Sequence, residues 1–345
     1  MRVELVKELN TMLSSGKSDF LCGLLLGVLI ASCGFAMLYR SVGQQANVCV
    51  LKLGHGLDQT HPVHLAMVHM QERLAELSGG TVRLDIYPGG MLGSETQCLE
   101  QVQTGLIDMT KSSTSPMESF WTEVGIFAIP YIFRDSDHLW NILDGEIGTM
   151  FLEMSPTMYG LCYYDAGARN FYSVSRPILS PENLRGMKIR VQQSRTAMDM
   201  IRHMGAAPTP IAWGELYTAL SQGTIDGAEN NLPSFETGRH SEICRHFTLN
   251  EHTFVPDMLL INRNRWDSLS PLQQQWLKTA AIESSVYQRE LWQKEEQRCR
   301  EAAEERGVQF HKVDKTPFIA ITAPMREEIT DPMIREIIQK IRENQ

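Results

Sequence analysis

The sequence predicts an α/β protein of two domains. Between Val48 and Lys111, three short apolar stretches alternate with two helical patterns, and this rhythm is typical of a parallel sheet covered by helices. The chain has 345 residues, which is long for a single domain. A further helical pattern opens at Ser270 and continues to Gly307. It covers about 36 residues, or roughly 54 Å, and could therefore run along both domains.

The individual elements follow from hydrophobic periodicity. Alternating apolar and polar residues predict strands, and apolar residues three or four positions apart predict helices. In the first half we expect strands at Val48–Leu53, Val82–Ile86, Ile107–Lys111 and Tyr159–Tyr164, helices at Pro62–Ser78 and Glu95–Thr104, and a polar loop at Ser112–Ser115. In the second half we expect a strand through Arg190, helices near Arg195–Met204 and Trp213–Ser221, a turn and strand reaching Asn231, a strand at Val308–Val313 and a helix at Asp331–Arg342.

Composition and charge exclude several classes of function. With 43% hydrophobic and 21% charged residues the chain can build ordinary cores. Its net charge is −9 and it has no basic tract, so nucleic acid is not expected as a partner. The motifs G-x-S-x-G and H-E-x-x-H are absent, and we expect no enzyme and no cofactor. His61 and His64 are the best metal candidate, but at a helix start a solvated or capping role is expected instead.

The N-terminal segment is the largest shift in composition. Phe20 to Tyr39 carries no charged residue. Three interpretations stay open for residues 1–44: a cleaved export signal, a lipoprotein attached through Cys33, or an anchor retained through residues 20–39. Each of them places the chain from about residue 45 onward outside the cytoplasm, in the periplasm. The five later cysteines form no C-x-x-C pair, and most of them are expected to be buried apolar residues.

One strand carries the most informative charged residue. Met187, Ile189 and Val191 alternate with polar residues, which predicts a half-buried strand with Arg190 near its end. Ligands gather at strand ends in α/β sheets, and a guanidinium matches a carboxylate with two hydrogen bonds. The alternative is an arginine on a solvated strand face.

Six motifs, in this order and at this spacing, resemble the solute-binding proteins of TRAP transporters, the DctP type. The resemblance covers about residues 48 to 340, and the motifs are PGGMLGSE at 88–95, Q-x-x-x-G-x-x-D at 101–108, GAR at 167–169, GMKIRV at 186–191, P-T-P-x-x-W-x-E-x-Y at 208–217 and QG-x-x-DG-x-EN at 222–230.

The resemblance implies a periplasmic binding protein of the type II kind, with mixed sheets flanked by helices and a long helix spanning both domains. One domain would comprise 45–166 plus 256–295, and the other 167–255 plus 296–345. Such a protein captures a carboxylate in the interdomain cleft and delivers it to the membrane permease. Here a sugar acid such as glucuronate or galacturonate is expected. A C4-dicarboxylate is the alternative ligand, and a ligand sensor is the alternative role.

The resemblance also implies the binding residues. Arg190 would clamp the carboxylate and Arg169 would be a second contact. Asn230 would orient Arg190 and the carboxylate, and Trp213 would pack near the ligand. Two arginines cannot be buried without an anion, because an unpaired buried charge is costly.

The remaining expected site residues are polar and would select for hydroxyl groups or line the pocket. They are Glu95, Ser113, Gln192, His55 and Asn231. Family members that bind 2-oxo acids through a metal ion have a tryptophan or an acidic residue where this chain has Asn231. We therefore predict no metal.

Overall fold

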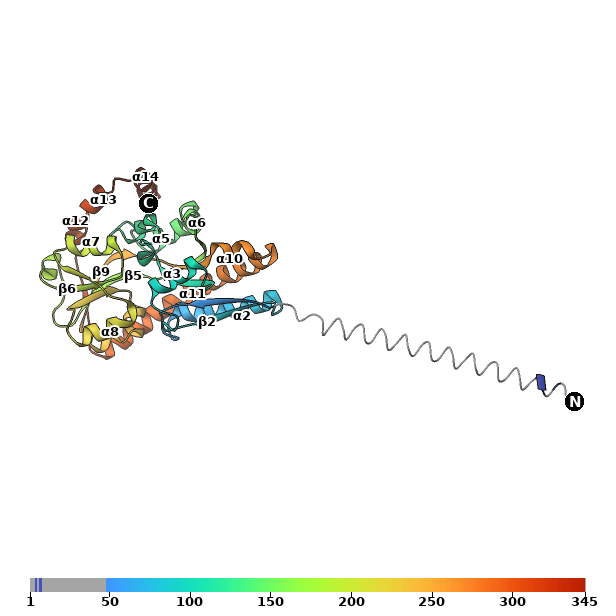
Figure 1. Ribbon diagram of the computed structural model, residues 1–345. Coiled ribbons are helices and arrows are strands. Elements are labelled where there is room, and N and C mark those ends of the chain that lie inside the picture. The colour runs from blue at the N-terminus through green and yellow to red at the C-terminus, as the bar shows by residue number, and fades with distance from the viewer. Residues whose placement is uncertain (1–3, 5, 8–47, 345) are drawn as a thin grey trace. The chain divides into compact units, whose positions relative to one another are not determined.

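The computed structural model describes Glu4, Val6, Lys7 and residues 48–344 (Figure 1). The predictions of an export signal, of lipidation at Cys33 and of an anchor over 20–39 lie outside the described residues. Among the helices that are described, none combines the length and the apolar character that a bilayer crossing needs.

The first sheet has five strands in the order β2-β1-β3-β10-β4. Their bounds are Cys49–Gly54 (β1), Val82–Tyr87 (β2), Met109–Ser113 (β3), Met158–Tyr164 (β4) and Asp257–Asn262 (β10). Strand β1 pairs in parallel with β2 and β3, as the strand–helix rhythm predicted. Strand β10 is antiparallel to β3 and β4, so the sheet is mixed.

The second sheet has six strands in the order β11-β9-β5-β8-β6-β7. Their bounds are Ala168–Ser173 (β5), Lys188–Val191 (β6), Ala207–Pro210 (β7), Gly227–Asn230 (β8), His246–Phe254 (β9) and Gln309–Lys312 (β11). Strand β6 lies between β8 and β7 and is parallel to both. Strand β7 contains two prolines and lies at the edge, where a missing N–H costs no ladder hydrogen bond.

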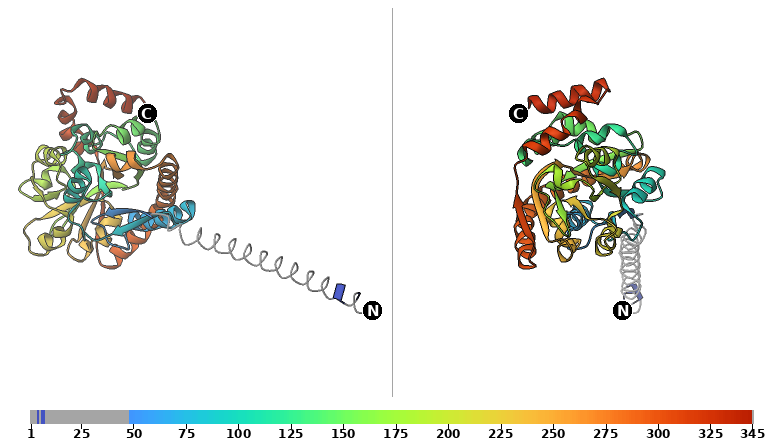
Figure 2. Two further views of the ribbon diagram at one scale, coloured as in Figure 1. Left: turned by 45° about the vertical axis from the view of Figure 1, so that its right-hand side comes forward. Right: turned by 90° about the vertical axis from the view of Figure 1, so that its left-hand side faces the viewer.

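Helices cover these sheets (Figure 2). Their bounds are Pro62–Ser78 (α2), Glu95–Thr104 (α3), Thr114–Met117 (α4), Ser136–Leu143 (α5), Glu146–Glu153 (α6), Arg195–His203 (α7), Trp213–Ser221 (α8), Leu232–Thr237 (α9), Arg263–Ser268 (α10), Pro271–Glu305 (α11), Thr316–Thr322 (α12), Pro324–Glu327 (α13) and Pro332–Glu343 (α14). Capping explains why several predicted bounds are accurate: Ser94 forms a capping box before α3, and Gly105 closes that helix in the left-handed conformation.

Each sheet separates two hydrophobic cores, and the strand period of two sorts side chains between them. On β10, Leu259 and Ile261 pack in the core beneath α2 and α11. Met258 and Leu260, one position away in each case, pack in the core that includes residues of α3, α5 and α14. The two cores of the second sheet follow the same rule, since Phe171 and Tyr172 on β5 belong to different cores.

The long helix α11 has 35 residues and begins with a capping box at Ser270, close to the prediction. It contacts α2 and β4 of the first sheet's half and α9 of the second. The chain passes from the first sheet to the second after β4, returns after β9, and crosses again after α11. The exact domain boundaries that we predicted along this path stay a prediction.

One expectation about local structure was wrong. Ser112 and Ser113 belong to β3, and the next four residues form the short helix α4. Pairing with β10, in which Ser113 lies opposite Asp257, extends the strand beyond the apolar residues. Arg190 is buried, which excludes the alternative of an arginine on a solvated strand face.

All five cysteines in the described part of the chain have free thiols. Cys98, Cys162, Cys244 and Cys299 are buried, as expected, whereas Cys49 is partly exposed.

Gly167 lies in the crossover from β4 to β5 and has a positive φ of 55°. An added Cβ would lie 2.8 Å from Glu296 Oε1 and 2.9 Å from Trp292 Nε1 on α11. At Gly186, φ is 76° and nothing lies within 4 Å of an added Cβ. We expect Gly186→Ala to cost only the left-handed penalty, about 1–2 kcal/mol, and Gly167→Ala to cost more. Urea unfolding measures both, and equal losses would contradict the prediction.

Candidate functional site

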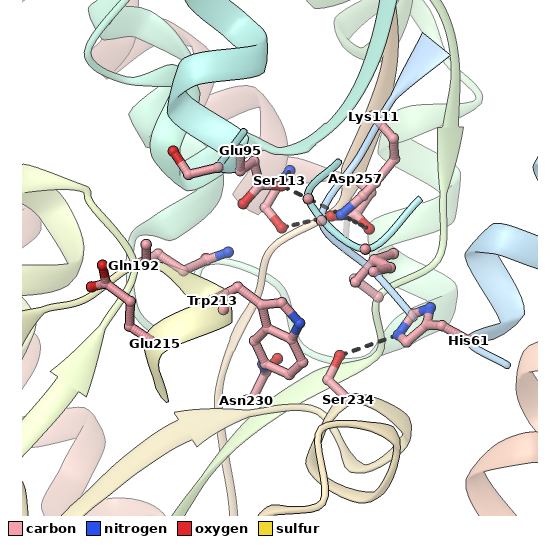
Figure 3. Close-up of a pocket in the computed structure, with 18 of the residues that line it drawn as sticks. His61, Glu95, Lys111, Ser113, Gln192, Trp213, Glu215, Asn230, Ser234 and Asp257 are labelled. Atoms are coloured by element: carbon pink, nitrogen blue, oxygen red, sulfur yellow. Dashed lines mark hydrogen bonds and ion pairs between the residues drawn. The ribbon is translucent and has the colours of Figure 1, made fainter. Parts of the chain in front are cut away.

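A cavity of about 330 Å³ is lined by residues of both sheets and their helices (Figure 3). This volume is at the lower end of the range for pockets that bind small molecules, roughly 300–1,000 Å³. Eight of the nine predicted site residues line it: Glu95, Ser113, Arg169, Arg190, Gln192, Trp213, Asn230 and Asn231. These residues are up to 136 positions apart in the chain. They meet at the cavity because strand ends and helix starts from both sheets lie around it.

Arg190 is the least satisfied of the buried charged groups at this cavity. Its residue is only 3% exposed. Its Nε donates to the carbonyl oxygen of Ile211 at 2.9 Å, and no carboxylate among the described residues forms an ion pair with it. Burial lowers the pKa of Arg190, and it also lowers the pKa of the neighbouring His240 to about 3, with the Arg190 charge acting in the same direction. The guanidinium is therefore a buried cation with hydrogen-bonding capacity left over.

Arg169 has its counterion within the protein. Its Nε and Nη2 donate to the two carboxylate oxygens of Glu229, the second at 2.8 Å. Burial alone would raise the pKa of Glu229, but the Arg169 charge lowers it to about 2. The expectation that both arginines require an external anion was therefore wrong for Arg169, because Glu229 neutralises it.

The two asparagines use their carbonyl oxygens inside the protein. Asn230 Oδ1 accepts from Arg169 Nη1 at 2.9 Å. This side chain therefore orients Arg169, whereas we had expected it to orient Arg190. Asn231 caps α9, accepting from the N–H of Ser234 at 2.8 Å. Both side-chain nitrogens lack a partner among the described residues and can donate to a solute in the cavity.

The wall from the first sheet contains an ionic network. Lys111 Nζ lies 2.9 Å from Asp257 Oδ2 and 3.4 Å from Glu95 Oε1. Ser113 donates from its hydroxyl to Asp257 Oδ1 at 2.6 Å and from its backbone N–H to Glu95 Oε1 at 2.7 Å. Lys111 was not predicted as a site residue. A lysine inside a strand that is otherwise buried was the signal for it, because such a charge needs partners.

Gln192, two residues after Arg190, and Trp213, at the start of α8, also line the cavity. Trp213 is the first residue of α8 and packs edge-to-face on His240, with 5.1 Å between ring centroids. The Gln192 side chain has no hydrogen-bond partner among the described residues. Both are therefore available to a solute, one through its ring and one through its amide.

His55 is buried next to the cavity but does not line it. Its Nε2 is 3.0 Å from His64 Nδ1, and its Nδ1 accepts from the N–H of Leu57 at 3.2 Å. His61 does line the cavity, and its Nδ1 accepts from the N–H of Val63 at the start of α2, which confirms the capping role. The described residues contain no group of three or more metal-ligating side chains.

Side-chain contacts join the two halves of the protein. His61 Nε2 lies 3.3 Å from Ser234 Oγ on α9. Glu118, which follows α4, accepts from the hydroxyls of Ser194 at 2.6 Å and Thr196 at 2.8 Å, at the start of α7. A solute in this position would contact groups from both sheets.

A cavity between two α/β units, with an unpaired arginine in its wall, defines a two-domain protein that binds a small anionic solute. The chain belongs to family 7 of the bacterial extracellular solute-binding proteins, because the DctP model of that family matches residues 53–332. This confirms the resemblance to TRAP solute-binding proteins and the predicted fold class.

Solved structures of similar proteins agree. A TRAP periplasmic solute-binding protein from Bradyrhizobium sp. BTAi1, in complex with D-galacturonate, is 38% identical, has a TM-score of 0.83, and is matched over 85% of this chain and 99% of its own. One from Citrobacter koseri, with bound D-glucuronate, is 35% identical, has a TM-score of 0.82, and is matched over 86% and 99%. An uncharacterized protein of Salmonella typhimurium is 35% identical over 85% of this chain and 90% of its own length.

Proposed function

We propose that the protein captures a sugar acid, a uronate such as galacturonate or glucuronate, and delivers it to the membrane subunits of a TRAP transporter. The observation that carries the proposal is the buried guanidinium of Arg190, which has one hydrogen bond and no ion pair among the described residues. A carboxylate supplies the missing charge and accepts two parallel N–H bonds from the guanidinium.

The rest of the cavity suits a hydroxylated ring. The amide nitrogens of Asn230 and Asn231 donate, the Glu95 carboxylate accepts, and Trp213 offers an apolar face. Two similar proteins of known structure hold galacturonate and glucuronate. These groups favour a uronate over a C4-dicarboxylate, which has fewer hydroxyls to satisfy them.

Binding and closure are coupled in this proposal. With the halves apart, water hydrates Arg190. With the halves together, Arg190 is buried, and the solute favours this form because it replaces the lost water. The contacts of His61 with Ser234, and of Glu118 with the start of α7, then hold the closed form.

The proposal is tested by the thermal stability of the purified protein with candidate solutes. D-galacturonate or D-glucuronate at about 100 times Kd should stabilise the fold by roughly 2.7 kcal/mol and raise Tm. D-galactose, which has the ring hydroxyls without the carboxylate, is the control and should leave Tm unchanged. A larger shift with succinate than with either uronate would contradict the proposal in favour of a C4-dicarboxylate.

A further inference from the structure

The two sides of the cavity differ in net charge. On the side of the second sheet, Glu229 neutralises Arg169, so that, apart from the exposed Glu215, Arg190 leaves one positive charge. On the side of the first sheet, the carboxylates of Glu95 and Asp257 outnumber the single ammonium of Lys111 and leave one negative charge. The cavity therefore has a cationic side and an anionic side.

The anionic side is built by deeply buried groups. The side chains of Lys111 and Asp257 are each 5% exposed, whereas that of Glu95 is 20% exposed. Burial alone would lower the pKa of Lys111, but the two carboxylates hold it above its ordinary value. The ammonium charge of Lys111 is therefore paired with Asp257 and Glu95, and it attracts an anionic solute only weakly.

Glu95 is the member of this group that can reach a solute. Its Oε1 accepts from the Ser113 N–H and from Lys111, but its Oε2 has no partner among the described residues. Asp257 has both oxygens engaged, by Ser113 and by Lys111. A free oxygen on a partly buried carboxylate accepts strongly from a hydroxyl and repels another carboxylate.

We propose that Glu95 makes the site selective for acids with a single carboxylate: it accepts a hydrogen bond from a solute hydroxyl and, together with Asp257, rejects a second carboxylate. The inference rests on the proposed function, in which Arg190 holds the first carboxylate. It assigns Glu95 two effects, attraction of one solute class and repulsion of another, and specific sites commonly combine these effects.

The test compares D-galacturonate with galactarate, which carries a carboxylate at both ends, by calorimetry. The wild-type protein should prefer galacturonate. Glu95→Gln keeps the size of the side chain and leaves Lys111 paired with Asp257, and it should reduce this preference by roughly tenfold. The preference is the ratio of the two dissociation constants, and the test compares this ratio between the variant and the wild type. The difference in shape between the two acids therefore cancels.

Glu215 provides the matched control. It also lines the cavity, but it is exposed and lies away from Lys111 and Asp257 (Figure 3). Glu215→Gln removes the same charge and should change both affinities by the same factor. An unchanged preference in Glu95→Gln, with normal galacturonate binding by the wild type, would overturn this inference alone. A wild-type protein that binds neither acid would overturn the proposed function with it.

Discussion

Replacing Arg190 with alanine is expected to weaken uronate binding by at least about 2 kcal/mol, or roughly thirtyfold in Kd. The reason is that the other buried arginine of the site, Arg169, is already neutralised by Glu229 and cannot take over the carboxylate. The fold should remain intact, because the variant removes a buried cation that has no ion pair among the described residues. Calorimetry gives Kd, and urea unfolding gives the stability.

Arg190→Lys separates charge from geometry. An ammonium keeps the positive charge but cannot form two parallel bonds to a carboxylate, so binding should still be weaker than in the wild type. A dissociation constant that is unchanged in Arg190→Ala would defeat the assignment of the carboxylate to this residue.

Glu229→Gln is expected to destabilise the fold by about 3–5 kcal/mol, because it leaves the Arg169 guanidinium buried without a counterion. The double variant Arg169→Met with Glu229→Met removes both charges and should recover much of the loss, since buried ion pairs and apolar pairs of similar size are often equally stable. Urea unfolding of the three proteins measures this. A single variant as stable as the wild type would show that the pair has no structural importance.

The pH dependence of the same pair has a definite sign. The folded-state pKa of Glu229 is depressed from 4.5 to about 2. Its contribution to stability is therefore complete above pH 4.5 and is lost as pH falls from about 4.5 towards 2. The wild-type protein should lose stability in this window, and Glu229→Gln should lack that part of the loss.

Periodicity and capping predicted the elements whose boundaries are set locally. Helices α2, α3 and α8 begin and end where the sequence analysis placed them. Strand β3 was misplaced, because it ends where β10 stops pairing with it, and the partner lies about 145 residues further along the chain. Local patterns cannot report such a partner.

The site residues divide in the same way, into those that local motifs predict and those that depend on contacts between distant strands. Arg190 and Glu95 could be predicted from motifs, and the structure places them at one cavity. The pairing of Arg169 with Glu229 and of Lys111 with Asp257 could not, because each joins residues of different strands through side-chain geometry. The predicted contact of Asn230 with Arg190 was wrong for the same reason. The sequence shows that an amide is present but not which of the two arginines it contacts.

The free cysteines affect how the protein resists oxidation outside the cytoplasm, where thiols are readily oxidised. Burial raises the pKa of Cys162, Cys244 and Cys299 to about 12 and that of Cys98 to about 11. Since only the thiolate reacts, the native state is inert at these positions. A newly exported or heat-unfolded chain lacks that protection. Folding must therefore be faster than disulfide formation. Thermal unfolding in air is expected to become irreversible, because intermolecular disulfides then link the unfolded chains.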